Sequence, residues 1–178
     1  MLAKPTIMKF GGTSVADAAA FERVARIVRA HKDARPVVVV SAMSGVTDAL
    51  LRGIETAASG DVSSALASID AHLARHLEVA RALASENDAS RFATTITERR
   101  GELGALLQKV ERQQANRPAL GDEIVSIGEQ LSATVLALVL QTADLPAVYV
   151  DARRVVVTDS EHGRANPLMA KTAKRAAK

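Results

Sequence analysis

Five residues near the N-terminus carry chemistry that suits a phosphate group: Lys9, Gly11, Gly12, Thr13 and Ser14. The glycines let a ligand approach the backbone, whose N–H groups can bind phosphate oxygens, and a helix start adds partial positive charge. The lysine can bring a full charge to a phosphoryl group during transfer. This order differs from a Walker motif, in which the lysine follows the glycines. Taken alone, the pattern predicts either one wall of a phosphoryl-transfer site or a plain strand-to-helix turn.

A second polar loop, SAMSGVTD at residues 41–48, follows a valine-rich segment. Ser41, Ser44 and Thr47 offer neutral hydrogen-bonding groups, and Gly45 allows a ligand to come close. Because open α/β sheets bind ligands at the carboxyl ends of their strands, this loop is a candidate binding segment. The alternative is an ordinary loop in which Thr47 or the following aspartate caps the next helix.

Glu129 lies in the middle of the mostly apolar segment 123–141. The segment is apolar on all sides, which predicts burial of Glu129. A buried carboxylate is costly unless it is paired, so a ligand ammonium group is an attractive partner. Gly128 would let another group approach closely. The alternative is a structural ion pair with Arg153 or Arg154.

The histidines do not form a pattern typical of a metal site. His72 and His76 are four residues apart, which suits one face of a helix, but no carboxylate motif accompanies them. We therefore expect the histidines to be solvated, and we predict no metal ligands. The chain has no cysteine, which excludes disulfides and thiolate metal sites.

Strands and helices must hold these groups in place. A short strand is predicted at 6–10, followed by a helix that Ser14 caps and that runs to about residue 31. Residues 37–40 are four valines without alternation, which predicts a strand covered on both faces of a parallel sheet. This order is a βαβ unit, with a right-handed crossover expected.

The remainder of the chain reads as mostly helical. A helix is expected over about 49–58, and two long helices at 62–85 and 91–115 predict a helical hairpin that serves as a lid or scaffold. The stretch NRPALGD should break the chain before a strong helix at 123–141. A third strand, and a fourth short one, are predicted within 147–159, and Pro167 favours the first turn of a last helix.

Composition limits the classes of protein that this chain can belong to. Of its 178 residues, 48% are hydrophobic and 24% are charged, which is ordinary for one globular domain. Aromatic residues make up only 2%, which argues against a base-stacking nucleic-acid surface. No segment reads as a membrane span or secretory signal, so we expect a cytoplasmic protein without membrane or nucleic-acid partners.

Four motifs resemble those of the aspartate kinases, in the same order and at similar spacing. They are KFGGTSV (9–15), VVSAMSGVTDALL (39–51), GDEIVSIGEQLSA (121–133) and GRANP (163–167). The resemblance implies an α/β architecture, the amino-acid-kinase fold, with a mainly parallel sheet between helices. It also implies ATP-dependent phosphorylation of the β-carboxylate of L-aspartate to 4-phospho-L-aspartate, which leads to lysine, threonine and methionine. ATP would be the co-substrate, together with Mg²⁺.

The resemblance also implies a role for each candidate residue. Lys9 matches the lysine that stabilises charge on the transferring phosphoryl group. Ser41 and Thr47 fall in the substrate-binding loop, and Glu129 matches the glutamate that receives the α-ammonium group. The phosphate-binding turn corresponds to Gly11, Gly12, Thr13 and Ser14. Because the substrate carboxylate is already ionised at neutral pH, catalysis would rest on alignment and charge neutralisation.

The motifs cover only part of the family pattern. The sequence therefore predicts that residues 1–178 form the N-terminal portion of an amino-acid-kinase domain, without the downstream nucleotide-binding part or the ACT regulatory domains. Such a portion is expected to be weakly active or inactive alone, and a full-length parent to be a homo-oligomer. Two alternatives stay open: another carboxylate kinase of this fold, and a non-catalytic binding or assembly module. Fusion to homoserine dehydrogenase and the feedback amino acid are also open.

Overall fold

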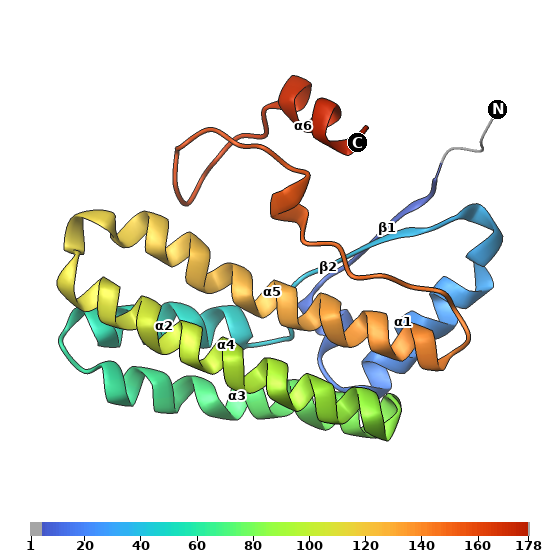
Figure 1. Cartoon of the computed structure of the whole chain (residues 1–178), viewed down its shortest axis with the longest axis horizontal. Coiled ribbons are helices and arrows are strands. Elements are labelled where there is room, and N and C mark those ends of the chain that lie inside the picture. The colour runs from blue at the N-terminus through green and yellow to red at the C-terminus, as the bar shows by residue number, and fades with distance from the viewer. Residues whose placement is uncertain (1–4, 178) are drawn as a thin grey trace.

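A computed structural model describes residues 5–177 of the chain (Figure 1). Strand β1 (Ile7–Phe10) is followed by helix α1 (Ala18–Ala30) and strand β2 (Val37–Val40). The two strands pair in parallel, with Lys9 opposite Val39. This confirms the predicted βαβ unit, which carries one candidate loop at the end of each strand.

Four helices form most of the body: α2 (Val46–Ala58), α3 (Val62–Leu83), α4 (Glu86–Arg112) and α5 (Arg117–Thr142). Helices α3 and α4 pack against each other, which confirms the helical hairpin. Each begins at a side-chain cap: Asp61 accepts from the Ser64 N–H at 2.9 Å, and Ser85 accepts from the Asp88 N–H at 3.1 Å. The helix after SENDAS thus starts earlier than predicted, because Ser85 within that stretch is the cap.

Helix α5 is the centre of the core. It packs against α1, α2, α3, α4 and β2. By length and composition α5 could cross a membrane, so the prediction that no segment qualifies is wrong, although 61% of its most apolar window is buried inside the protein. A core helix passes the same test.

Two helices, α1 and α5, begin at other residues than predicted. Ser14 lies inside a short 3₁₀ helix (Gly12–Val15), and the cap of α1 is Asp17, which accepts from the Ala20 N–H at 2.8 Å. The predicted break at NRPALGD is also wrong. Pro118 stands in the first turn of α5, where a missing N–H costs nothing.

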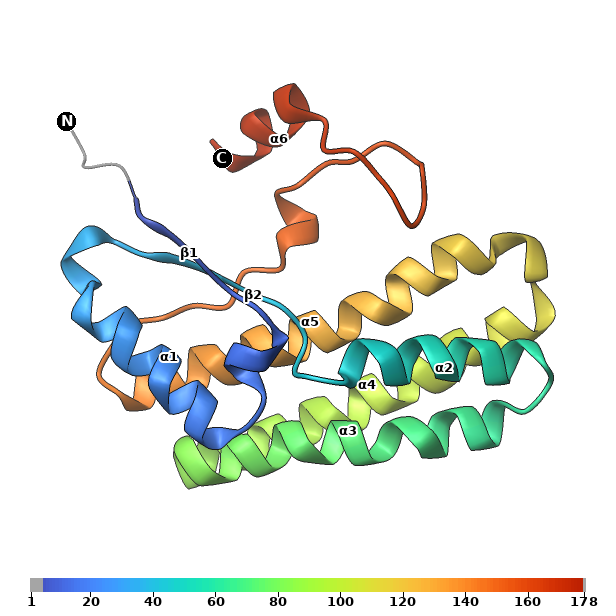
Figure 2. The same cartoon turned by 180° about the vertical axis from the view of Figure 1, so that it is seen from behind.

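The C-terminal part contains less regular structure than predicted. Within the described residues, no strand forms over 147–159: this segment makes no ladder with β1 or β2, and it carries a 3₁₀ turn (Ala152–Arg154). Thr158 makes an isolated antiparallel bridge to Pro167, so that proline precedes helix α6 (Met169–Ala176) rather than starting it. In Figure 2 helix α6 lies apart from the helical body, while the loop before it reaches α5, where the Gly163 N–H donates to the Asp122 carboxylate at 3.0 Å.

Two burial expectations are also wrong. The sheet is not covered on both faces in the described chain, since Val37 and Val39 are 47% and 46% exposed. His76, expected to be solvated, is fully buried because its face of α3 lies in the core between neighbouring helices.

Candidate active site

The parallel pairing of β1 and β2 brings the two candidate loops together. Because both strands end at the same edge, the loop after Phe10 and the loop after Val40 start side by side, and the Ser41 N–H donates to the Phe10 carbonyl at 3.1 Å. Lys9, one residue before the end of β1, is exposed at this edge. The sheet thus places an ammonium group beside two polar loops.

Ala42 is the point at which three segments meet. A Cβ atom added to Gly12 would lie 2.9 Å from the Ala42 carbonyl oxygen, so the first loop touches the second directly. A Cβ atom added to Gly128 would lie 3.2 Å from the Ala42 Cβ and 2.9 Å from the Val46 side chain. The close approach predicted for Gly128 is therefore present, and it sets Glu129 beside the second loop.

Glu129 and Lys9 influence each other electrostatically. Loss of water raises the pKa of the Glu129 carboxyl, and the positive charge of Lys9 opposes that change. The side chain is nevertheless exposed, so the predicted burial is wrong: its neighbours Gly128 and Gln130 are buried, but the helix surface is open at Glu129. Arg153 does not pair with Glu129; it donates to Asp151 at 2.7 Å and to Gln130 at 3.1 Å. An exposed carboxylate that is partly shielded from water can receive a ligand cation.

The remaining predicted residues lie in the same two loops. The Ser14 N–H donates to the Gly11 carbonyl at 2.9 Å, closing the turn, and Thr13 is exposed. Thr47 is the exposed second residue of α2. The alternative in which Thr47 or the next aspartate caps α2 is wrong, because the cap position is Gly45, whose φ of 80° suits glycine.

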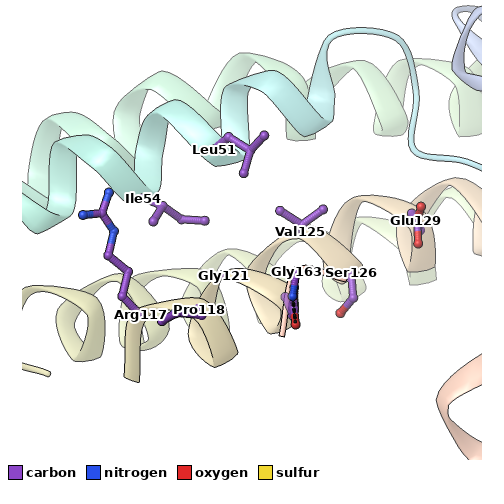
Figure 3. Close-up of a pocket in the computed structure, with 10 residues that line it drawn as sticks. Leu51, Ile54, Arg117, Pro118, Gly121, Val125, Ser126, Glu129 and Gly163 are labelled. Atoms are coloured by element: carbon purple, nitrogen blue, oxygen red, sulfur yellow. Dashed lines mark hydrogen bonds between the residues drawn. The ribbon is translucent and has the colours of Figure 1, made fainter. Parts of the chain in front are cut away.

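A groove of about 700 Å³ leads to the site between α2 and α5 (Figure 3). Leu51 and Ile54 on α2 face Val125 on α5, and Glu129 lies at one end with Arg117 at the other. The groove reaches the predicted site only at Glu129. Sequence reasoning did not predict it, because its walls come from ordinary apolar helix positions.

Arg75 contacts the segments around both candidate loops, and sequence reasoning did not predict it. It lies on α3, within the hairpin, and donates to the Ser44 carbonyl at 2.9 Å and to the Ala16 carbonyl at 2.8 Å. Its partners are 31 and 59 residues away in the chain. No local pattern marks such a residue, because its role depends on how the hairpin packs.

The first loop leaves room beside the ammonium group of Lys9. A Cβ atom at Gly11 would lie 3.6 Å from the Lys9 Nζ, so the glycine keeps open the space beside the ammonium group. Within residues 5–177, no three histidine, aspartate or glutamate side chains gather to hold a metal ion.

The two glycines predict different effects of alanine. Gly12→Ala forces a methyl group against a backbone carbonyl, so we expect a loss of about 1–3 kcal/mol in the free energy of unfolding. Gly11→Ala has an allowed φ of −78° and only an ordinary contact, so the fold should keep its stability while phosphate binding weakens. Urea unfolding and pyrophosphate titration of both variants measure the two effects. Equal stability of the two variants would contradict the close contact at Ala42.

Two βα loops and one core helix thus form a site that offers an ammonium group and a carboxylate to a ligand with both an anionic and a cationic group. The model of the amino acid kinase family matches residues 4–176, and the chain belongs to that family. It is similar to lysine-sensitive aspartokinase 3 of Escherichia coli (strain K12), with 34% identity over 174 residues, 96% of this chain and 36% of that protein. It is also 31% identical to the chloroplastic bifunctional aspartokinase/homoserine dehydrogenase 1 of Zea mays, over 86% of this chain and 17% of that protein.

A solved structure gives the same result at the level of the fold. The chain matches E. coli aspartokinase III in complex with aspartate and ADP (R-state), with a TM-score of 0.83 and 33% identity, over 98% of this chain and 37% of that chain. The resemblance to aspartate kinases and the amino-acid-kinase fold predicted from the motifs are confirmed. The chain spans about a third of the length of the E. coli enzyme.

Proposed function

We propose that this chain is part of an aspartate kinase, which transfers the γ-phosphoryl group of ATP to the β-carboxylate of L-aspartate and forms 4-phospho-L-aspartate. The observation that supports the proposal is the meeting of both βα loops and α5 at Ala42, together with the effect of the Lys9 charge on the Glu129 carboxyl. This arrangement occurs in a chain that is 33% identical to a structure holding aspartate and ADP.

Each side chain then has a defined task. Lys9 neutralises charge on the phosphoryl group as it moves between oxygens. Ser41 and Thr47 donate hydrogen bonds to the amino acid, and Glu129 holds its α-ammonium group, so that the β-carboxylate is aimed at the phosphorus atom. The turn that receives the ATP phosphates is formed by Gly11, Gly12, Thr13 and Ser14. Mg²⁺ bound to the nucleotide would supply further charge neutralisation.

We also propose where the chain lies within a longer protein. Residues 1–178 would be the N-terminal portion of the catalytic domain. The adenine-binding part and the ACT domains would lie in other segments of the same polypeptide. The whole protein would be a cytoplasmic homo-oligomer. The reaction needs neither a nucleic acid nor a membrane. The supporting fact is that the chain covers 36% of the E. coli relative.

Aspartate binding tests the proposal directly. We expect Glu129→Gln, which keeps the shape but removes the charge, to weaken L-aspartate binding about 10- to 100-fold, because a charged hydrogen bond is lost. Calorimetric titration in the presence of Mg-ADP measures this effect. The matched control is Glu123→Gln, an exposed glutamate on the same helix, which should bind aspartate normally.

The pH dependence of binding provides a second test. Because the pKa of Glu129 is raised, acidification should weaken aspartate binding at a higher pH than an ordinary glutamate would produce. Tighter binding of L-glutamate than of L-aspartate would instead indicate another carboxylate kinase. A folded, monodisperse chain that binds neither ligand would indicate a binding or assembly module. Hydroxylamine trapping of aspartyl phosphate shows whether residues 1–178 alone suffice for turnover.

A further inference from the structure

Arg75 joins the two loops of the candidate site from outside. Its Nη1 donates to the Ser44 carbonyl in the second loop, and its Nη2 donates to the Ala16 carbonyl just after the first loop, at 2.9 and 2.8 Å. The two bonds come from one planar guanidinium group, whose nitrogens have a fixed separation. The spacing of the two loops is therefore tied to the width of a single rigid group.

Each of the two carbonyl groups lies just before the start of a helix that follows a binding loop. Ser44 precedes Gly45, where the backbone turns with a φ of 80° into the start of α2. Ala16 precedes Asp17, the cap of α1. Arg75 thus restrains the segment between each binding loop and the helix that follows it.

The charge of Arg75 acts on its surroundings. It lowers the pKa of His72 on the same helix, after the larger effect of burial. Its partners are neutral carbonyl oxygens, so the bonds leave its positive charge in place, behind loops that are proposed to receive anions.

We propose that Arg75 is a positioning residue that holds the phosphate loop and the amino-acid loop at the separation that phosphoryl transfer requires. The proposal rests on the proposed function, and it gives the helical hairpin a specific task. It predicts that binding of Mg-ADP and binding of L-aspartate favour each other, because each ligand orders a loop that Arg75 ties to the other.

The test compares Arg75→Ala and Arg75→Lys with Arg81→Ala, an exposed arginine on the same helix. In Arg75→Ala, amide hydrogen exchange should rise at least about 10-fold in both 11–17 and 42–46, because two charged hydrogen bonds are lost. Core amides of α5 should be unchanged. Arg75→Lys should give an intermediate rise, since one ammonium group cannot reach both carbonyls with the same geometry, and Arg81→Ala should give none.

The effect of one ligand on the affinity for the other distinguishes a positioning role of Arg75 from a general contribution to stability. We expect the affinity for Mg-ADP to rise when L-aspartate is present in the wild type, and this rise to vanish in Arg75→Ala although each ligand still binds. A rise in exchange in only one loop, or throughout the protein, would overturn the proposal, as would intact coupling. These titrations use a chain that also contains the adenine-binding part. If its wild type binds neither ligand, the proposed function and the positioning task both fail, while exchange in residues 1–178 still shows whether Arg75 restrains both loops.

Discussion

Lys9→Ala is expected to lower the rate of aspartate-dependent phosphoryl transfer by about 10²- to 10³-fold, the usual loss for one group aimed at developing charge. Lys9 lies at the end of β1, and Gly11 keeps the space beside its Nζ open. Trapping of aspartyl phosphate with hydroxylamine measures the rate, in the 178-residue chain or in a longer chain that contains it. Lys109→Ala on α4, also exposed, is the matched control and should retain the rate.

The same variant has a second readout that does not need turnover. Because Lys9 lowers the pKa of Glu129, its removal should raise that pKa further, which NMR titration of the Glu129 carboxyl detects. Mg-ADP binding should also weaken. A Lys9→Ala protein with an unchanged rate and an unchanged Glu129 titration would show that Lys9 does not belong to this site.

The residues of the candidate site could be predicted from local sequence patterns together with one rule about parallel sheets. The four valines of β2 and the segment around Lys9 are recognisable strands, and parallel strands end at the same edge of a sheet. The two loops therefore had to meet. Gly128 beside Glu129 indicated a close approach, and the Ala42 and Val46 side chains provide it.

Features that depend on packing between distant segments could not be predicted. Arg75 has no local signature, because its partners come from two other parts of the chain. The all-round apolar pattern of α5 predicted burial of Glu129, but the groove between α2 and α5 opens at that residue. Capping chemistry alone could not choose between Ser14 and Asp17, since both are good caps.

His76 is expected to make the protein unstable in acid by on the order of 3 kcal/mol, the value of a pKa change from 6.5 to about 4. Its Nδ1–H donates to the His72 carbonyl at 2.8 Å, since a carbonyl oxygen can only accept. Its Nε2 is buried, and it has no hydrogen-bond partner among the described residues. A second proton would therefore create an unpaired charge in the core.

The direction follows from the two pKa values. Burial lowers the pKa of His76 in the folded protein to about 4, whereas the unfolded chain keeps the ordinary value of 6.5. Between these values the unfolded chain binds more protons, so the free energy of unfolding falls as pH decreases from 6.5 to 4. Above pH 6.5 this contribution is complete and constant.

Urea unfolding at several pH values measures the effect, and His76→Leu should remove most of the slope between pH 6.5 and 4. A smaller slope should persist, because burial also lowers the pKa of His72. The control is His31→Ala, which removes an exposed histidine instead of a buried one. A full slope in His76→Leu would assign the acid sensitivity to other groups. A flat wild-type profile would mean that water or a hydrogen-bond acceptor reaches Nε2 when it is protonated, which would make the burial of His76 less costly than its surroundings imply.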